Sequence, residues 1–499
     1  MTVTPILRDA ARRTRARARS EPAGAPYPPL TAAERLELLC DVGTLRTIRT
    51  TVTSRRMGEK ARPGDGVVAG AGEIDGRPIF CYAQDASFAG GSLGAAHADS
   101  IVRVLELAGA ARVPVIGFVE SGGARMQEGT AALGGYGRIF RQNVALSGQV
   151  PQISVIAGTS ACGGSYSPAL TDFVLMTKRA SMFLTGPGVV AEVMGEQVSA
   201  DELGGHKVHE RNGVCQFVAE DDAESIFMVR ELLSFLPQSS SERPPERRSV
   251  ASIGGDPGAC VPTEQRRVYD VRDVIHRLVD GGRLLEVSER WARNMVVGFA
   301  RIEGRSVGIV ANQPHHLGGT IDSAAAQKAA RFVRTCNAFG LPLVVLVDAP
   351  GFLPGSKQEA SGVIRHGAKL LHAFAEATVP RLTVVLRKAF GGAYITMNSR
   401  DLGADMAFAW PQAEIGVMGA GQAVGVIARR EIAAAEDPEA ARAALAADYA
   451  AEHLSASIAA REGFIDEVIE PRETRARLAW ALTALDRERR VPRGGNIPL

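Results

Sequence analysis

Two stretches of the chain repeat one order of apolar and polar positions. Each contains apolar residues at the i, i+3, i+4, i+7 spacing of a helix with one buried face: Ile101, Val104, Leu105 and Ala108 in the first, and Ala329, Phe332, Val333 and Cys336 in the second. Continuous apolar runs follow each helix, at 113–119 and 152–158 and again at 341–347 and 381–387. Such runs are typical of strands buried on both faces. Helices alternating with them predict an α/β fold with largely parallel strands.

The two stretches align as copies of one another. The segment that begins at Glu73 falls on the segment that begins at Arg301 without a gap, at an offset of 228 residues. The offset is 229 between Pro151 and Pro380 and returns to 228 where Gly163-Gly164 falls on Gly391-Gly392. The sequence therefore predicts an internal duplication, with two tandem copies of one α/β domain.

Changes in composition along the chain suggest the domain boundaries. Arginines crowd the first residues, and a stretch rich in Ser, Pro, Gly and Arg separates the two copies. We expect a flexible basic tail at 1–29, an N-terminal domain at 30–245, an exposed linker at 246–265 and a C-terminal domain at 266–499.

The overall composition argues against several classes of protein. The 499 residues are 45% apolar and carry a net charge of +2, which favours neither nucleic acid nor a membrane surface as a partner. No apolar run reaches the roughly 18 residues of a membrane span. The six cysteines lack zinc-ligand spacing, and the adjacent His315 and His316 lack a third ligand. We expect a cytoplasmic protein with reduced thiols and no bound metal.

Each copy contains a Gly-Gly turn between an apolar run and a helical stretch, in "SACGGSYSP" from Ser160 and "KAFGGAYIT" from Lys388. Glycine lets a ligand approach the backbone, and the first N–H groups of a helix lack partners. The phosphate-binding patterns GxxxxGK[ST] and GxGxxG are absent from these turns. The glycines serve either tight helix–strand packing or an oxyanion hole, in which peptide N–H groups stabilise a developing negative charge. Recurrence at equivalent places favours a paired binding function.

Two carboxylates, Glu120 and Asp348, occupy matching strand ends. They are candidates for catalytic groups or for caps of the following turn or helix, and we expect capping. The sequence contains no compelling acid/base pair.

An ordered set of motifs runs from about residue 30 to the C-terminus: "GGSLGAAHAD", "ESGGARMQEG", "YSPALTDFVLM", "FLTGPGVV", "DELGGHKVH", "GIVANQP", "DAPGFLPG", "RHGAKLLHAFAEATVP", "FGGAYITMNSR" and "WPQAEIGVMGA". Together they resemble the carboxyltransferase β subunit of biotin-dependent acyl-CoA carboxylases of the acetyl-/propionyl-CoA type. The resemblance implies two tandem crotonase-like (ClpP/crotonase) domains, an acyl-CoA side in the N-terminal one and a biotin side in the C-terminal one. It also implies dimers that assemble into hexamers, with each active site between the N-domain of one subunit and the C-domain of its mate.

The resemblance further implies a reaction in which CO2 moves from carboxybiotin to the α-carbon of acetyl-, propionyl- or butyryl-CoA. The N–H groups of Gly392 and Ala393 would stabilise the ureido oxyanion, with Gly391 and Tyr394 also on the biotin side. Peptide N–H groups of Cys162, Gly163 and Gly164 would hold the thioester enolate, and which two of the three do so stays open. Ser121, Gly122, Gly123 and Ala124 would contact CoA. Ile395 would select the acyl group, because relatives that accept acetyl-CoA tend to have Ile there and those that prefer propionyl-CoA tend to have Asp.

The chain has no lysine in an "AMKM" context and no ATP-binding glycine loop. Biotin is therefore expected on a separate α subunit that carries biotin carboxylase. Cys162, Gly188 and Gly421 depart from residues common in the family. Three alternatives stay open: the carboxyltransferase of a biotin-dependent decarboxylase, a scaffold subunit of low activity, and a crotonase-like hydratase or hydrolase that acts without biotin.

Overall fold

A computed structural model describes residues 29–486 and 495–496. The predicted basic tail lies outside the described residues, apart from Pro29. The chain divides into two compact units, Met1–Leu233 and Ser234–Leu499, and each is described by itself. Most residues of the predicted linker at 246–265 are exposed, and Arg247 N–H donates to the carbonyl of Gly304 in the second unit (3.0 Å).

The first unit is built on an eight-stranded sheet with the order β1-β2-β3-β4-β5-β6-β8, and β7 pairs with β5. The β1, β2 and β3 strands pair antiparallel, and the strands from β3 to β8 pair in parallel. Its strands are β1 (Arg46–Ile48), β2 (Val67–Ile74), β3 (Arg77–Gln84), β4 (Val115–Ser121), β5 (Gln152–Ala161), β6 (Phe173–Thr177), β7 (Ser181–Phe183) and β8 (Phe217–Ala219).

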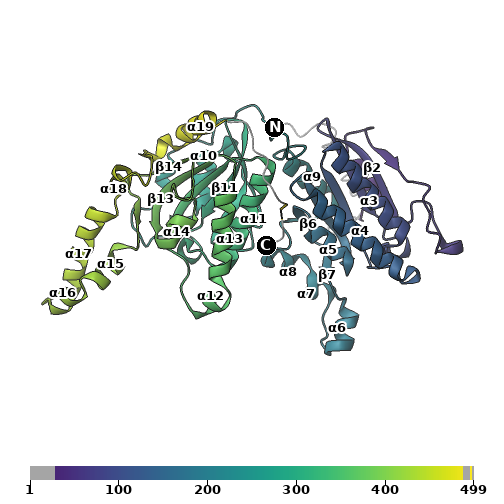
Figure 1. Cartoon of the computed structure of the whole chain (residues 1–499), viewed down its shortest axis with the longest axis horizontal. Coiled ribbons are helices and arrows are strands. Elements are labelled where there is room, and N and C mark those ends of the chain that lie inside the picture. The colour runs from purple at the N-terminus through teal and green to yellow at the C-terminus, as the bar shows by residue number, and fades with distance from the viewer. Residues whose placement is uncertain (1–28, 487–494, 497–499) are drawn as a thin grey trace, which may run out of the picture. The chain divides into compact units, whose positions relative to one another are not determined.

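Helices flank this sheet, and α3 and α4 lie side by side (Figure 1). The helices of the unit are α2 (Ala32–Leu39), α3 (Ala95–Ala111), α4 (Thr130–Leu146), α5 (Gly163–Ala169), α6 (Pro187–Met194), α7 (Ala200–Gly204), α8 (His206–Asn212) and α9 (Asp222–Leu233).

The second unit repeats this sheet, with the order β16-β14-β13-β12-β11-β10-β9 and with β15 paired to β13. The strands from β11 to β16 pair in parallel, and β9, β10 and β11 pair antiparallel. Its strands are β9 (Leu285–Glu286), β10 (Met295–Ile302), β11 (Arg305–Asn312), β12 (Leu343–Ala349), β13 (Arg381–Phe390), β14 (Met406–Ala409), β15 (Glu414–Gly416) and β16 (Glu467–Val468).

The helix pair α11 and α13 packs together in this unit as α3 and α4 do in the first. Its helices are α10 (Val271–Leu278), α11 (Ser323–Phe339), α12 (Ser356–Ala360), α13 (Val363–Glu376), α14 (Gly391–Thr396), α15 (Ala420–Ile427), α16 (Arg429–Ala434), α17 (Pro438–His453), α18 (Ala456–Arg461) and α19 (Thr474–Ala484).

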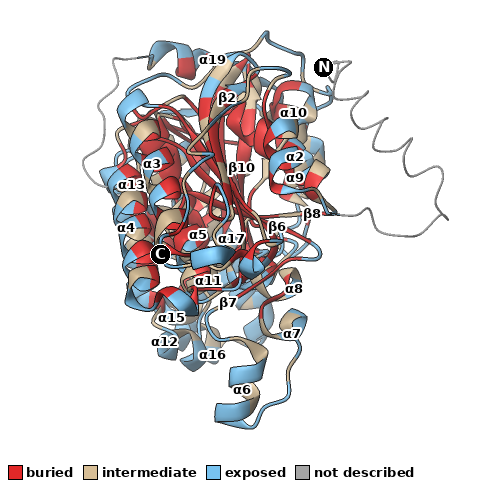
Figure 2. Cartoon of the chain, turned by 90° about the vertical axis from the view of Figure 1, so that its right-hand side faces the viewer, coloured by how far each residue is buried: buried red, intermediate tan, exposed pale blue. Residues whose placement is uncertain are grey.

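The predicted duplication and α/β architecture are present. The helices α3 and α11 begin and end at residues 228 apart, as do β4 and β12. The apolar helix positions predicted from the sequence are all buried, and the strands of both sheets are mostly buried in Figure 2. Burial of these apolar faces is the main force that holds each unit together.

A buried histidine of α3 gives the first unit a predictable response to acid. Burial, with the positive charge of Arg125 as a further cause, lowers the pKa of His97 from 6.5 to about 3. Below pH 6.5 the unfolded chain therefore binds a proton that the folded chain does not, so acid favours unfolding. Between pH 7 and pH 5, the free energy of unfolding should therefore fall by about 2 kcal/mol less in His97→Gln than in the wild-type chain. Urea denaturation at the two pH values measures this, and an unchanged loss in the variant contradicts it.

Candidate functional site

The turn of the first unit follows the central strand β5. Directly after the strand, Cys162 has a positive φ of 53°, and α5 begins at Gly163. The N–H of Cys162 donates to the carbonyl of Phe183 in β7 (3.1 Å). This N–H is committed to the sheet, so only Gly163 and Gly164 of the predicted trio have N–H groups outside it.

The turn of the second unit follows β13 and has the same form. Gly391 has a φ of 57° and begins α14. The last residue of each central strand pairs with the last residue of its short neighbour, Ala161 with Phe183 and Phe390 with Gly416. Cys162 is therefore the counterpart of Gly391. The structure moves the sequence alignment by one residue, so that the pair Gly163-Gly164 corresponds to Gly392-Ala393.

The N–H groups at these two turns differ from those of the surrounding sheet. Within residues 29–486, the hydrogen bonds leave the N–H groups of Gly163, Gly392 and Ala393 without acceptors. Such groups at the start of a helix attract negative charge. A Cβ on Gly163 would lie 2.6 Å from the ring of Tyr136, so this position requires glycine.

The predicted CoA-contacting residues lie beside the first turn. A Cβ built on Gly123 would lie 3.4 Å from the Cβ of Cys162. The buried Ser121 hydroxyl lies 3.2 Å from the Gly123 N–H, which donates to it, and 3.4 Å from the Tyr136 hydroxyl. Burial raises the pKa of Tyr136, so this hydroxyl keeps its proton at neutral pH. Sequence reasoning did not identify Tyr136, whose place at the turn depends on the packing of α4.

The two residues after the second turn have different surroundings. The Tyr394 hydroxyl donates to the carbonyl of Phe464 (3.3 Å), and burial raises its pKa to about 12. The side chain of Ile395 is 47% exposed, so it is not part of the core. By the structural alignment its counterpart in the first unit is Tyr166, which is 52% exposed.

The expectation that Glu120 and Asp348 act as caps is wrong. Glu120 pairs with the buried Arg35 (2.9 Å). Asp348 pairs with the buried Arg387 (3.0 Å), and burial raises the pKa of this carboxyl although Arg387 opposes the shift. Arg387 also donates to the carbonyl of Arg267 (2.8 Å), which ties the segment before α10 to β13. Each carboxylate thus balances a buried arginine, because an unpaired buried charge is costly.

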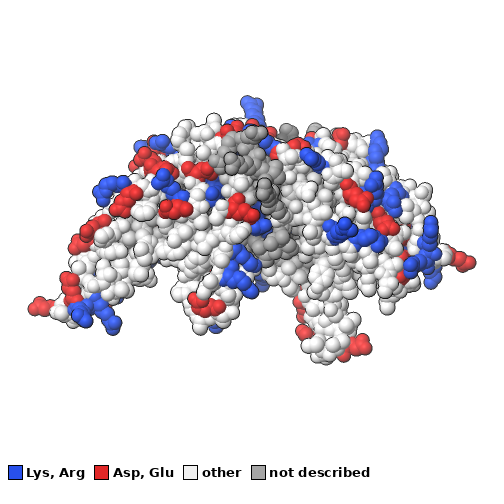
Figure 3. Space-filling model, viewed as in Figure 1, with Lys and Arg blue, Asp and Glu red and all other residues white. Residues whose placement is uncertain are grey.

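Gly188 and Gly421, which depart from the residues common in the family, lie on two matching helices, α6 and α15. Each helix follows the short strand beside its turn, β7 or β15, and a Cβ at either glycine would meet nothing within 4 Å. Apolar side chains of both helices are exposed, among them Val193 and Val426. The α6 segment is largely exposed in Figure 2. In Figure 3 it is mostly white, the colour of residues other than Lys, Arg, Asp and Glu. Apolar surface of this kind indicates an interaction site.

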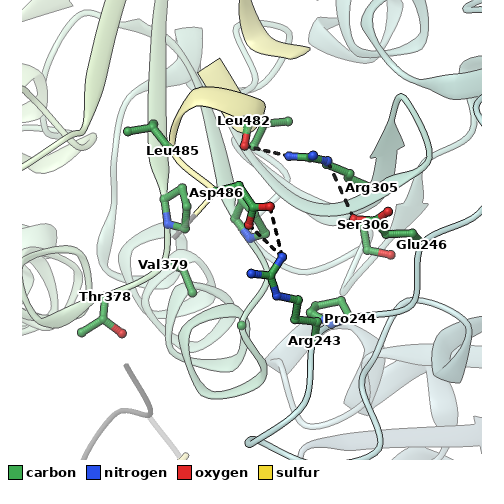
Figure 4. A pocket seen from close by; sticks show the side chains of 13 residues that line it. Arg243, Pro244, Glu246, Arg305, Ser306, Thr378, Val379, Leu482, Leu485 and Asp486 are labelled. Carbon is green, nitrogen blue, oxygen red and sulfur yellow. Dashed lines mark hydrogen bonds and ion pairs between the residues drawn. The ribbon is translucent and has the colours of Figure 1, made fainter. Parts of the chain in front are cut away.

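A separate small pocket of about 100 Å³ lies in the second unit (Figure 4). It includes Pro342 and Pro380, which precede β12 and β13. The pocket therefore lies at the amino ends of these strands, whereas Gly391 follows the carboxyl end of β13. An ion pair between Arg243 and Asp486 (2.9 Å) lines it. Among the described residues, no three His, Cys, Asp or Glu side chains group as metal ligands, and no helix is both long and apolar enough to cross a bilayer.

The exposed thiol of Cys162 predicts a selective inactivation. Of the six cysteines, four are buried and Cys260 is half-buried. Iodoacetamide should therefore modify Cys162 first and block the first turn. After treatment with iodoacetamide, the Cys162→Gly variant should keep the carboxyl transfer activity that the sequence resemblance implies. Glycine adopts a positive φ without strain, and it occupies the matching position in the second unit. Activity assays with mass mapping test this, and a labelled Cys162 with full activity contradicts it.

Comparisons with known proteins agree with this architecture. The sequence pattern of the family described as "Carboxyl transferase domain" matches residues 28–495. The methylmalonyl-CoA carboxyltransferase 12S subunit of Propionibacterium freudenreichii subsp. shermanii is 49% identical over 480 residues, covering 94% of this chain and 91% of that protein. The propionyl-CoA carboxylase beta chain of Saccharopolyspora erythraea is 48% identical over 493 residues, covering 94% and 90%.

A crystal structure of transcarboxylase 12S, described as a hexamer assembly with methylmalonyl-CoA and methylmalonic acid bound, matches with a TM-score of 0.91 and 45% identity. The match covers 100% of this chain and 99% of that one. The predicted fold of two similar crotonase-like α/β domains is confirmed.

Proposed function

Because the chain belongs to the family of carboxyl transferase domains, we propose that it moves CO2 from carboxybiotin to the α-carbon of a short-chain acyl-CoA. The products would be malonyl-, methylmalonyl- or ethylmalonyl-CoA. The names of its relatives, a methylmalonyl-CoA carboxyltransferase and a propionyl-CoA carboxylase, support this substrate class. The observation that carries the proposal is the pair of equivalent turns with N–H groups outside the sheet, at Gly163 and at Gly392.

In the first unit, the N–H groups of Gly163 and Gly164 act on the acyl-CoA. They donate to the thioester oxygen, which becomes negative when the α-carbon loses its proton. The bond between Cys162 N–H and Phe183 supports this choice of two donors out of three. The N–H of Gly164 interacts with the Tyr136 hydroxyl, which the thioester oxygen would replace as its acceptor. Ser121, Gly122, Gly123 and Ala124 line the approach to this turn and contact CoA.

In the second unit, the N–H groups of Gly392 and Ala393 donate to the ureido oxygen of biotin. Carboxybiotin, when bound, supplies CO2 and a nitrogen that takes the α-proton. The residues present fit this group, because the N–H groups of Gly392 and Ala393 lie in the first turn of α14 and lack acceptors among the described residues. Gly391 and Tyr394 shape the same side of the site, and Ile395 selects the acyl group.

Biotin arrives on a separate α subunit that also holds biotin carboxylase. The subunits of this chain form a hexamer built from dimers in the cytoplasm, with each active site between the first unit of one subunit and the second unit of its mate. The hexamer of transcarboxylase 12S supports this assembly. So do the exposed apolar residues of α6 and α15, which a second subunit would cover.

The departures from the family pattern leave the proposed chemistry in place. Gly188 and Gly421 lie on exposed helices outside both turns. Cys162 contributes its N–H to the sheet rather than to the ligand. No observation favours a scaffold subunit or a decarboxylase over the carboxyltransferase.

One assay tests the reaction. The protein is mixed with a biotinylated α subunit, ATP and labelled bicarbonate, and incorporation into acetyl-, propionyl- and butyryl-CoA is compared. Label is expected in acid-stable carboxyl products with at least one of the three. No product from any of them, with an α subunit shown to carboxylate its biotin, would overturn the proposal.

Mixed subunits test where the active site lies. Gly164→Pro disables the first turn of one subunit and Gly392→Pro the second turn of another. If each site joins two subunits, equal mixing restores about a quarter of the wild-type activity, because half of the dimers are mixed and one of their two sites is intact. If each site lies within one chain, the mixture stays inactive.

A further inference from the structure

A buried arginine holds the loop that continues from β4 past the first turn. The Arg125 side chain is fully buried. Its guanidinium pairs with Asp65 (2.6 Å) and Glu128 (2.9 Å), and it also donates to the carbonyls of Asp65 and Ser92. We call Arg125, Asp65 and Glu128 the arginine clamp.

The two carboxylates of the clamp also hold the start of α3. Glu128 accepts the N–H of Ala95 (2.7 Å), and Asp65 accepts the N–H of His97 (2.9 Å). The N-cap residue of α3 is Gly94, which has no side chain to do this, and a Cβ there would collide with the clamp. The clamp therefore joins the loop after β4 to the helix that lies over the sheet.

The second unit builds the same backbone without the clamp. In the first unit, Leu93 N–H donates to Gly123 and Arg125 N–H donates to Leu93 (2.8 and 3.0 Å). In the second unit, Ile321 N–H donates to Gly351 and Leu353 N–H donates to Ile321 (3.1 and 2.9 Å).

At an offset of 228, the counterparts of Arg125, Glu128 and Asp65 are Leu353, Ser356 and Arg293. The helix α11 is capped by its own Asp322, which accepts the N–H of Ala325 (2.8 Å). The fold thus does not need the clamp. Buried charge is costly unless it is fully paired, so its presence in one unit alone points to a task specific to that unit.

We propose that the arginine clamp positions Ser121–Ala124 to receive acyl-CoA, with Arg125 as the positioning residue. This inference rests on the proposed function, in which the first unit takes the acyl-CoA. The loop touches the turn directly, because Gly123 packs against Cys162. A shift of the loop would misplace the CoA chain while the N–H groups of the turn keep their geometry. The clamp therefore acts on substrate binding more than on the chemical step.

The test is Arg125→Lys in the full chain. Lysine keeps the charge but cannot reach two carboxylates and two carbonyls at once. The KM for propionyl-CoA should rise roughly tenfold or more at a nearly unchanged kcat, with the same rise in the Kd of propionyl-CoA by calorimetry. The KM for the biotinylated subunit should not change.

Two further variants separate positioning from stability. Arg230→Lys alters another buried arginine of the same unit, which pairs with Asp41 (2.8 Å) and lies outside the loop contacts; it should lower stability without raising the KM. Asp65→Asn/Arg125→Leu/Glu128→Ser removes the whole clamp, leaves no unpaired buried charge, and should raise the KM and Kd at least as much. Unchanged KM and Kd in both clamp variants would overturn the inference. A wild-type chain that binds propionyl-CoA without transfer would instead count against the proposed function alone.

Discussion

Replacing Gly392 by proline is expected to lower turnover roughly 10²–10³-fold, because proline removes a backbone N–H that acts in the transition state. The position is in the first turn of α14, where proline is compatible with a helix. Carboxyl transfer to propionyl-CoA at saturating substrates measures the loss. The variant must first form the same oligomer as the wild-type chain.

The matched control is Gly392→Ala. Its Cβ would lie 3.6 Å from the ring of Phe352, an ordinary contact, and the N–H stays in place. We expect the alanine variant to keep most of its turnover. Full activity of a correctly assembled Gly392→Pro protein would contradict the proposal that the Gly392 N–H stabilises an oxyanion in the second unit. Equal losses in both variants would assign the effect to packing.

The duplication was predictable because the same apolar periodicity and the same glycines recur in the sequence at a nearly constant offset. The buried face of α3 follows directly from the spacing of Ile101, Val104 and Leu105. The antiparallel hairpin of β2 and β3 also has a signal in the sequence. It lies in Asp75-Gly76, where both residues have positive φ and a two-residue hairpin turn requires such a pair.

Other parts of the site could not be predicted from the sequence. Matching Gly-Gly with Gly-Gly misaligned the two turns, because the residue with positive φ is glycine in one unit and Cys162 in the other. The pairing of the strand ends shows that the offset of 229 found at Pro151 and Pro380 continues through the turn. The arginine clamp joins Asp65 to Arg125 across 60 residues, and neither spacing nor composition marks such a contact.

The choice of acyl group should depend on Ile395. The residue lies two positions after Ala393 on α14, and it is half exposed. Its side chain is therefore free to meet a ligand beside the second turn. A pocket wall that gains or loses about one methylene discriminates by only about 1–3 kcal/mol. We therefore expect the wild-type chain to accept more than one of acetyl-, propionyl- and butyryl-CoA.

Ile395→Asp is expected to shift the ratio of kcat/KM values toward propionyl-CoA by roughly tenfold, because the shorter polar side chain changes both the space and the polarity beside the acyl group. The three substrates are compared in one competition assay with the assembled enzyme. Ile253→Asp provides the matched control, since Ile253 is an exposed isoleucine of the same unit within the predicted linker. The control should keep the wild-type ratios. If Ile395→Asp keeps them as well, while assembly and total activity are preserved, then Ile395 does not select the substrate.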